Sequence, residues 1–562
     1  MAGHRAGQGG RWVGPACAVG PLLFLAVFFA WPVLVILDTG LGAGGRVDFG
    51  PVGEVLGDRE LRRVLWFTVV QAIASTVLTL VLALPGAWVL ARFDFPGRTL
   101  VRAAITVPFV LPTVVVGTAF VGLLGARSPI NGLLELLPGV SEGPLAFEQG
   151  IGAVLLAHVF FNYAIVVRTV GGLWSHIDPR LEEAARALGA SPWQAFREVT
   201  LPLLRPAIAA AASIVFLFTF TSFGVVLILG GPRWSTIEVE IRRQTQFLFD
   251  LPVASALAVI QMIMVGATLV FWSRYQRRTA VRQQLRAAGT VARRPRPGRE
   301  RWLVGANLIF LLLLLGAPLI VLVERSLVTV DGYGLGNWRA LDETRRGSTL
   351  FVSPLDAVTN SLVAAVLATV MAVVLGLLAA LAVTQWRGRG AATVDALLML
   401  PLGTSAVTVG FGFLVAFDDA PLDFRGSWLL VPIAQALIAT PFVVRTLTPV
   451  LASMQIRLRE AAAVLGAGPL RAWREVDFPI VARALLVAAG FGFAVSIGEF
   501  GATNFVARSD RPTVPVAIFR FLGQPGVNNL GQAMALSTIL MVLTTVAVLA
   551  IERLRDLEGS EF

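Results

Sequence analysis

Lysine is absent from this chain of 562 residues, and all 46 of its Lys-plus-Arg residues are arginine. A phosphate-binding loop of the G-x-x-x-x-G-K-S/T kind needs a lysine that reaches the phosphate groups. The sequence therefore excludes such a loop, and none of its polar segments is long enough to form an ATPase domain. If ATP drives the function of this chain, another polypeptide must hydrolyse it.

Cysteine and histidine are scarce as well. A single cysteine, Cys17, excludes a disulfide framework and a thiol metal site. The three histidines, His4, His158 and His176, are too scattered in sequence to predict a metal cluster. We therefore expect no metal and no cofactor in this chain, and no catalytic residues.

Charged residues are few, and the acidic ones are outnumbered, which gives a formal net charge of +11. Hydrophobic residues make up 56% of the chain, charged residues 14%, and the mean hydropathy is +0.76. This composition is typical of an integral membrane protein. Apolar runs of about 18 residues or more predict membrane-spanning helices. They predict an all-α protein with twelve spans, at residues 15–37, 65–91, 104–125, 150–172, 206–230, 251–273, 302–323, 357–384, 396–416, 428–452, 484–507 and 530–551.

The distribution of charge predicts the orientation. With a cytoplasmic N-terminus, inner loops and tails carry 28 arginines and 14 acids, and outer loops carry 16 arginines and 20 acids. The net charge is then +14 inside (28 − 14) and −4 outside (16 − 20), which follows the positive-inside rule. We expect both termini in the cytoplasm. A basic inner face beside anionic membrane lipid explains the high pI without a nucleic-acid partner.

Two stretches of the chain, 277 residues apart, are nearly the same. Residues 183–202 read EAARALGASPWQAFREVTLP and residues 460–479 read EAAAVLGAGPLRAWREVDFP, identical at 12 of 20 positions without a gap. Both lie between apolar runs, and both face the cytoplasm in the predicted topology. Two matched copies argue against a loop that merely packs on its own helix bundle.

The duplication extends beyond this loop. An offset of 293 residues carries Thr76 onto Thr369, and an offset of 277 carries Phe223 onto Phe500. Because each half begins and ends on the inner side, the halves are parallel repeats related by an axis along the membrane normal, with a pathway expected at their interface. The predicted parts are two six-span halves, 1–273 and 302–562, and a basic, proline-rich cytoplasmic linker, 274–301.

Each copy of the loop predicts two short helices joined by a turn. Residues 181–188 are good helix formers, and Gly189 ends that helix because glycine tolerates the left-handed conformation. Ser191 is placed to cap a second helix, with Pro192 at its first position and Gln194 three residues on. A short, rigid pair of helices facing the cytoplasm suits docking into a groove of a partner protein.

This loop resembles the cytoplasmic "EAA" loop of type I permeases of ATP-binding-cassette (ABC) importers. The resemblance covers nearly the whole chain, as two fused permease halves. It implies that a short coupling helix in each loop inserts into a separate ATPase, here a dimer, and that an extracytoplasmic solute-binding protein delivers the cargo. It also implies location in the bacterial inner membrane. The residues that match the motif are Glu183, Ala184, Ala185, Gly189, Glu460, Ala461, Ala462 and Gly466.

Three further strings resemble those of thiamine importer permeases. They are residues 155–162 (LLAHVFFN), residues 229–238 (LGGP followed by TIE) and residues 496–501 (SIGEFG). Fused ferric-iron importer permeases have the same two-half plan and a similar turn in the eleventh span. The resemblance implies thiamine or thiamine phosphate as cargo, with ferric iron as the alternative. Most of the specificity would reside in the solute-binding protein.

A secondary transporter with two six-span halves remains a more remote alternative. Such proteins usually place ionisable residues within spans to carry a coupling ion, whereas Glu499 is the one acid inside a predicted span. A secondary transporter would also not need a docking loop in two copies. Co-purification of a separate ATPase would distinguish the two classes.

Polar residues within the spans are candidates for the pathway. Glu499 has Ser222 as its counterpart in the first half, an asymmetry that suits one cationic cargo met by one carboxylate. The alternative is a capped carboxylate at a glycine-rich kink. His158 and Asn162 lie at positions i and i+4 of one helical face, where a hydrogen bond between helices is the favoured alternative. The candidate pathway residues are Glu499, Phe500, Ser222, Phe223, His158 and Asn162.

Overall fold

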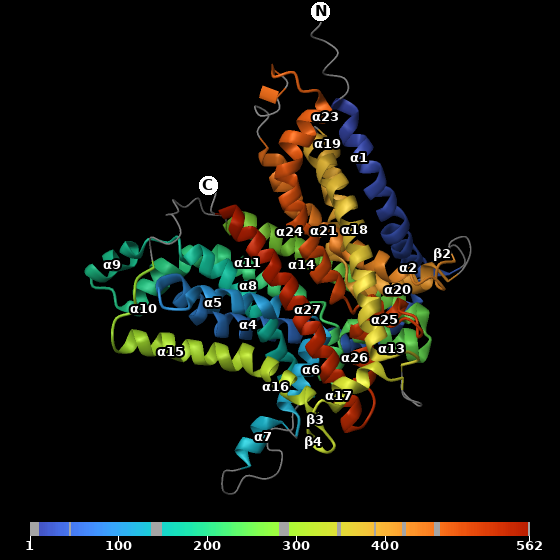
Figure 1. Ribbon diagram of the computed structural model, residues 1–562, viewed down its shortest axis with the longest axis horizontal. Coiled ribbons are helices and arrows are strands. Elements are labelled where there is room, and N and C mark those ends of the chain that lie inside the picture. The colour runs from blue at the N-terminus through green and yellow to red at the C-terminus, as the bar shows by residue number, and fades with distance from the viewer. Residues whose placement is uncertain are drawn as a thin grey trace, which may run out of the picture. The chain divides into compact units, whose positions relative to one another are not determined.

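The structure is a computed structural model that describes residues 10–43, 46–126, 128–135, 149–279, 292–344, 350–386, 389–418, 423–454, 461–462 and 464–559. The chain divides into two compact units. Unit 1 comprises residues 1–52, 241–259 and 329–562, and unit 2 comprises residues 53–240 and 260–328. Nearly all regular structure in both units is helical (Figure 1).

Unit 1 is built mainly from the second half of the sequence. It contains the strand pair β1–β2 (Gly42–Ala43 and Arg46–Val47) and strand β4 (Gly332–Tyr333), whose partner β3 (Val328–Thr329) crosses the division between the units. Its helices and π-helical or 3₁₀ turns are α1 (Gly10–Leu25), η1 (Ala26–Ala30), α2 (Trp31–Leu41), η3 (Gln244–Leu248), the first part of α14 (Leu251–Thr279), α17 (Gly336–Arg339), η5 (Ala340–Asp342), α18 (Pro354–Gln385), α19 (Arg389–Leu398), η6 (Leu400–Gly403), α20 (Ala406–Ala416), α21 (Leu430–Ser453), α23 (Pro469–Ala472), η7 (Trp473–Asp477), α24 (Phe478–Ile497), α25 (Thr503–Val506), α26 (Val514–Leu522) and α27 (Val527–Gly559).

Unit 2 is built mainly from the first half. Helix α3 (Gly50–Gly57) and helix α13 (Ile237–Arg243) cross the division between the units, and α14 enters unit 2 at Ile260. The remaining elements of unit 2 are α4 (Arg59–Arg92), α5 (Arg98–Val110), α6 (Thr113–Leu124), α7 (Pro129–Leu134), α8 (Ile151–Trp174), α9 (Pro179–Ala187), α10 (Pro192–Ala195), η2 (Phe196–Thr200), α11 (Leu201–Phe220), α12 (Gly224–Leu229), α15 (Arg299–Leu311), η4 (Leu312–Gly316) and α16 (Ala317–Ser326).

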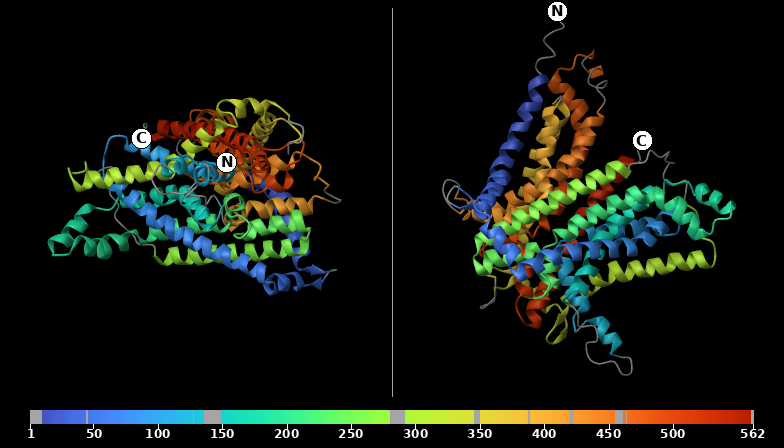
Figure 2. Two further views of the ribbon diagram at one scale, coloured as in Figure 1. Left: turned by 90° about the horizontal axis from the view of Figure 1, so that it is seen from below. Right: turned by 180° about the vertical axis from the view of Figure 1, so that it is seen from behind.

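The first span of each sequence half packs in the unit formed mainly by the other half. In unit 1, α1 packs along α18 and α2 packs on α20, as the blue and yellow helices of Figure 2 show from behind. In unit 2, α15 contacts α4 and α16 packs on α6. Both exchanged spans also contain a π-helical turn at their centre, η1 in the first and η4 in the seventh.

The repeat seen in the sequence is reproduced in the secondary structure. The elements α10, η2 and α11 of unit 2 become α23, η7 and α24 of unit 1 when 277 is added to every boundary. A π-helical turn adds one residue to a turn of an α-helix, and such a feature is uncommon. Its recurrence at the same position in both halves shows that the halves share a fold as well as a sequence pattern.

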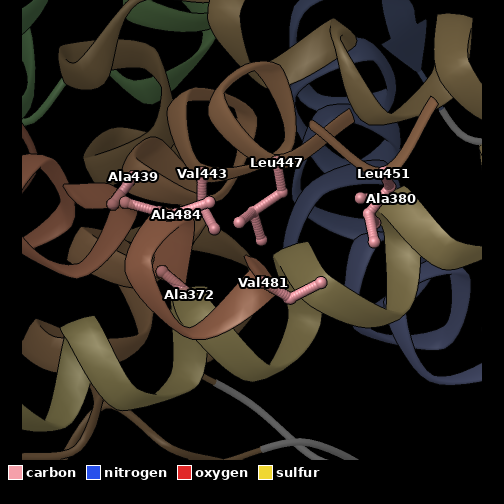
Figure 3. Packing of buried hydrophobic residues seen from close by; sticks show 9 residues of the cluster. Ala372, Ala380, Ala439, Val443, Leu447, Leu451, Val481 and Ala484 are labelled. Atoms are coloured by element: carbon pink, nitrogen blue, oxygen red, sulfur yellow. The ribbon is translucent and has the colours of Figure 1, made fainter. Parts of the chain in front are cut away.

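Small residues allow the helices of unit 1 to pack closely. A buried cluster joins α18, α21 and α24 (Figure 3). Gly376 of α18 lies so close to α21 that a Cβ atom at this position would overlap the side chain of Val443. In a membrane, where lipid offers as apolar an environment as leucine, close packing of small residues is a main source of helix association. The cluster residues are Ala372, Ala380, Ala439, Val443, Leu447, Leu451, Val481, Ala484 and Ala488.

The structure confirms an all-α membrane protein. Within the described residues, eleven helices are long and apolar enough to cross a membrane. The predicted ninth span corresponds to a shorter apolar helix, α20. The segment predicted as this span, residues 396–416, is divided into α19, η6 and α20. Pro401 and Gly403 lie at the break and favour it.

Three other predicted spans are divided in the same way. The third changes direction between α5 and α6, where Leu111 and Pro112 adopt extended or non-helical backbone. The fifth ends at Phe220 and the eleventh at Ile497, each followed by a turn and a short helix. Glu499 therefore lies in the turn between α24 and α25 and not within a helix, which corrects its predicted position.

Candidate functional site

The first repeated loop begins with α9, which is capped at both ends. The Asp178 side chain accepts a hydrogen bond from the Arg180 amide at 3.0 Å. At the other end Gly189 has a φ of 95°, the Gly189 amide donates to the Arg186 carbonyl, and the Ala190 amide donates to the Ala185 carbonyl. These two bonds form a Schellman motif. The structure thus confirms that Gly189 ends the helix in the left-handed conformation.

The second helix of this loop begins with the predicted capping box. The Ser191 hydroxyl accepts from the Gln194 amide at 3.2 Å, and the Gln194 side chain accepts from the Ser191 amide at 2.9 Å. Pro192 occupies the first helical position. Helix α10 then continues through η2 into α11, a candidate membrane span, without a break between them.

The second loop repeats this geometry where the structure describes it. Glu460 lies outside the described residues, whereas Ala461 and Ala462 are helical. Gly466 has a φ of 84°, and the Ala467 amide donates to the Ala462 carbonyl at 2.9 Å, the counterpart of the bond from Ala190 to Ala185. The two predicted coupling loops therefore share the same turn.

Apolar side chains project from both loops. Leu188 in the first loop is 90% exposed, and Leu465 at the same position of the second is 87% exposed. Trp193 and Val464 are exposed as well. Helices α9 and α10 lie beyond the ends of α8 and α11 in unit 2 (Figure 1). Burying a leucine side chain contributes about 2 kcal/mol, so these exposed leucines are available for an apolar contact.

Glu182, the residue before the motif glutamate, connects the first loop to the helix bundle. Its carboxylate lies 3.8 Å from the Arg92 guanidinium at the end of α4 and accepts a hydrogen bond of 3.4 Å from the Thr200 hydroxyl. Arg92 also donates to the Ile177 carbonyl. Glu183, by contrast, is exposed. The contacts of Glu182 were not predicted from the sequence. Two adjacent glutamates look alike in the sequence, and nothing there shows which of them contacts the helix bundle.

In unit 2 His158 connects three parts of the bundle. Its Nδ1 lies 2.8 Å from the Ser75 hydroxyl of α4, and its Nε2 lies 2.8 Å from the Ser222 hydroxyl after α11. Asn162 donates to the His158 carbonyl at 2.8 Å within α8. All four side chains are buried. His158 thus forms hydrogen bonds between helices, the alternative that was favoured over a role in the pathway. The Asn162 bond stays within its own helix.

In unit 1 Glu499 closes the corresponding turn by itself. Its carboxylate accepts from the Ala502 amide at 2.7 Å and from the Thr503 amide at 3.0 Å, and its carbonyl accepts from the Thr503 hydroxyl. The residue is 7% exposed. The structure therefore matches the capped carboxylate that the sequence analysis held as an alternative. No arginine forms an ion pair with Glu499 among the described residues.

Phe500 follows Glu499 and packs against Phe519, whose ring lies near Arg242 from the first half of the sequence. The Phe500 and Phe519 rings are 5.6 Å apart, and the Arg242 guanidinium lies 4.9 Å from the Phe519 ring centre. Arg242 also donates to the Asn504 side chain at 2.8 Å, and its burial lowers its pKa to about 10. Phe223, the counterpart of Phe500, is buried in unit 2.

Two buried acids were not among the predicted site residues. Glu238 and Glu240 of α13 are both almost completely buried, and the Gln261 side chain donates to the Glu238 carboxylate. Both lie between the predicted spans 206–230 and 251–273, and Glu238 belongs to a string that resembles thiamine permeases. The Glu238 bond to Gln261 is a tertiary contact, which the local sequence does not reveal.

The predicted site residues thus fall into distinct groups. His158, Asn162 and Ser222 form one hydrogen-bonded group in unit 2, whereas Glu499 and Phe500 lie in unit 1. The two repeated loops also belong to different units. Within each unit, a buried polar turn follows the span that begins at the loop.

Comparison with protein families gives one match to the region of the first loop. The family described as "Binding-protein-dependent transport system inner membrane component" matches residues 81–280. This segment contains α8, the first loop and α11.

Comparison with individual proteins gives matches along nearly the whole chain. The thiamine transport system permease protein ThiP of Brucella abortus is 28% identical over 533 residues, which cover 94% of this chain and 93% of that protein. ThiP of Escherichia coli is 28% identical over 502 residues, or 88% of this chain and 90% of that protein. ThiP of Haemophilus influenzae is 26% identical over 542 residues, or 94% of this chain and 96% of that protein.

Proposed function

Because the chain belongs to the binding-protein-dependent permeases of ABC importers, with two permease halves fused in one polypeptide, we propose that it forms the membrane pathway of one importer and is driven by a separate ATPase docked on its two loops. The observation that carries this proposal is the matched pair of loops. Each has a left-handed glycine, a helix that runs into a span, and an exposed leucine at the same position.

The loops suit a partner that forms a dimer. Two copies of one ATPase present two equal grooves, and two copies of one loop geometry fill them. The coupling residues in this proposal are Glu183, Ala184, Ala185, Gly189, Glu460, Ala461, Ala462 and Gly466. Helix α10 and its counterpart α23 are then the coupling helices, because each is continuous through a π-helical turn with the following span.

The energy source must be a separate chain. This polypeptide lacks lysine and hence a phosphate-binding loop of the usual kind. A solute-binding protein on the opposite side of the membrane is the second partner in the proposal, in keeping with the family description. The proposed topology has two halves, 1–273 and 302–562, a linker at 274–301 and both termini in the cytoplasm, in the inner membrane of a bacterial cell.

Thiamine or thiamine phosphate is the proposed cargo. The support is the similarity to thiamine permeases over both halves of the chain. Glu499 adds a physical argument, because its carboxylate is held by two amides and has no arginine partner among the described residues. A carboxyl group without a basic partner suits a cationic ring. A ferric-iron importer permease is the second candidate, and a bare ferric ion would require more oxygen ligands than one carboxylate supplies.

The test is ATP-driven uptake into vesicles that contain the chain, with its ATPase and binding protein added. Gly189→Val and Gly466→Val place a β-branched residue at a positive φ, so each should distort its loop without disturbing the spans. We expect uptake of thiamine to fall by about tenfold or more in each variant, since tenfold corresponds to only 1.4 kcal/mol of lost coupling, while ATP hydrolysis continues.

Gly172→Ala is the matched control, because Gly172 is helical, lies near the same end of α8 and has open space where a Cβ would stand. It should transport as the unmodified chain does. Full uptake in both loop variants would reject the docking proposal. Uptake of ferric iron without thiamine would reject the cargo and leave the docking proposal intact.

A further inference from the structure

The same backbone-to-hydroxyl hydrogen bond occurs once in each half. The residues around the two bonds can therefore be compared directly. In unit 2 the Ile237 amide donates to the Thr68 hydroxyl at 3.0 Å. In unit 1 the Val514 amide donates to the Ser361 hydroxyl at 2.7 Å. The offsets are 277 for the donors and 293 for the acceptors, the same as those of the sequence repeat. Residues around these bonds therefore occupy equivalent places.

In unit 2 this place is closed by aromatic rings. The residue before Thr68 is Phe67, and its ring lies 5.1 Å from that of Trp234. The hydroxyl of Thr236 is buried and donates to the Ser222 carbonyl at 3.1 Å. Phe67 is buried and Trp234 is partly buried, so aromatic rings occupy this place in unit 2.

In unit 1 the equivalent residues line a pocket. Asn360 corresponds to Phe67, Arg511 corresponds to Trp234, and Thr513 corresponds to Thr236. All three border a pocket of about 240 Å³. Thr513 is 2% exposed, and its hydroxyl has no hydrogen-bond partner among the described residues. A buried hydroxyl without a partner is costly, so it points to a ligand that completes the bond.

The charge around the pocket favours an anion. Arg508 lines the pocket but is already paired with Asp510 at 2.8 Å and 3.2 Å, and this arginine lowers the pKa of the Asp510 carboxyl. Arg511 has no ion pair among the described residues, and its guanidinium lies 5.5 Å from the Trp428 ring centre. One positive charge, from Arg511, is therefore left over. A phosphate group accepts hydrogen bonds from both a guanidinium and a hydroxyl.

An exposed apolar stripe begins at the same pocket. Val363 of α18 lines the pocket, and Val366, Val370 and Val374 follow it on one helical face, all exposed. From Val363 to Val374 the helix rises by about 16 Å, close to the roughly 15 Å of hydrocarbon in one leaflet. Trp428 stands at the start of this stripe, where aromatic residues mark the membrane–water interface.

We propose that this pocket binds the phosphate of an anionic phospholipid, whose acyl chain lies along the valine stripe of α18. Arg511 and the Thr513 hydroxyl hold the phosphate, with Trp428 at the headgroup level. The site is confined to unit 1 because unit 2 fills the equivalent space with Phe67 and Trp234. It lies at the N-terminal ends of α18 and α21, whereas the repeated loop follows the C-terminal end of α21.

The experiment measures lipid retention on the purified full-length chain by native mass spectrometry, with phosphatidylglycerol and phosphatidylcholine as probes. One uncompensated arginine should favour the anionic lipid by roughly fivefold. The double variant Asn360→Phe/Arg511→Trp installs the residues of the first half, and Arg511→Gln/Thr513→Val removes the two phosphate contacts. Both should abolish the preference. Arg233→Gln, an exposed arginine between α12 and α13, is the control and should keep it.

Two results would overturn the proposal. One is an unchanged preference for phosphatidylglycerol in both double variants, provided that each unfolds at the temperature of the unmodified chain. The other is displacement of the bound lipid by millimolar inorganic phosphate, which would mark the pocket as a site for a soluble oxyanion.

Discussion

The turn after the fifth span and the turn after the eleventh occupy the same place in the repeat but are held in different ways. Ser222 in unit 2 is bonded to His158, which reaches Ser75 of α4. Glu499 in unit 1 is bonded to the amides of Ala502 and Thr503, three and four residues along its own chain. The first turn therefore depends on neighbouring helices, whereas the second is self-contained.

The hydrogen bonds among Ser75, His158 and Ser222 are not repeated in unit 1, because the equivalent residues differ. His158 corresponds to Gln435, and Ser75 corresponds to Ala368. Alanine provides no hydroxyl for a bond across the helices, so unit 1 needs another means of fixing its turn. A carboxylate that accepts from amides of the next short helix provides it. A movement of α4 or α8 is thus expected to reach the first turn directly and the second only through packing.

The largest expected effect separates Glu499 from Ser222. Glu499→Ala leaves two buried amides without an acceptor, and charge-assisted hydrogen bonds contribute about 1.5–3 kcal/mol each. We expect the free energy of unfolding to fall by about 3 kcal/mol, against about 1 kcal/mol for Ser222→Ala. Denaturant unfolding in detergent, followed by tryptophan fluorescence, measures both. Equal losses would contradict the contrast between a self-contained and a shared turn.

His158 offers a smaller and more selective change. His158→Gln introduces the residue that unit 1 has at this position, and a glutamine side chain cannot reach both Ser75 and Ser222. One lost hydrogen bond should lower the free energy of unfolding by about 1–2 kcal/mol. Combining this change with Ser222→Ala should add less than the sum of the two, since the residues are in contact. Full additivity would show that the bond does not contribute.

The smallest effect tests the two threonines. Thr236→Val removes a hydroxyl that is bonded to the Ser222 carbonyl, and we expect a loss of about 1 kcal/mol. Thr513→Val removes a hydroxyl that has no partner among the described residues, so protein free of lipid should lose nothing measurable or gain slightly. The same unfolding measurement in delipidated detergent applies. A larger loss of unfolding free energy for Thr513→Val than for Thr236→Val would show that the Thr513 hydroxyl has a partner within the protein, and would contradict the assignment.

The turn and the helix caps of the first loop could be predicted from the local sequence. The end of α9 at Gly189 and the capping box of Ser191 and Gln194 depend on residues within a few positions of one another, so the sequence was sufficient. Breaks in the third, fifth and ninth spans were missed because long apolar runs masked the prolines and glycines within them. The exchange of first spans between the units has no local signal, since α1 and α15 are apolar helices of a common kind.

Tertiary contacts explain the other differences. The sequence marked Glu499 as the one acid within a span, but it did not show that the Ala502 and Thr503 amides donate hydrogen bonds to its carboxylate. It also did not reveal that Glu238 and Glu240 are buried, because burial depends on tertiary contacts such as the bond from Gln261 of α14 to Glu238. The sequence also did not show that Trp234 contacts Phe67, or that their counterparts Arg511 and Asn360 line one pocket.

The stoichiometry of the complex with the ATPase tests the central claim most directly. One chain carries two matched loops, so native mass spectrometry of the co-purified complex should find one copy of this chain with two copies of the ATPase. Replacing one exposed leucine, in Leu188→Asp or Leu465→Asp, should weaken one of the two docking contacts and yield complexes that retain a single copy. A complex that keeps two copies in the double variant Leu188→Asp/Leu465→Asp, or a chain that binds no ATPase at all, would contradict the account.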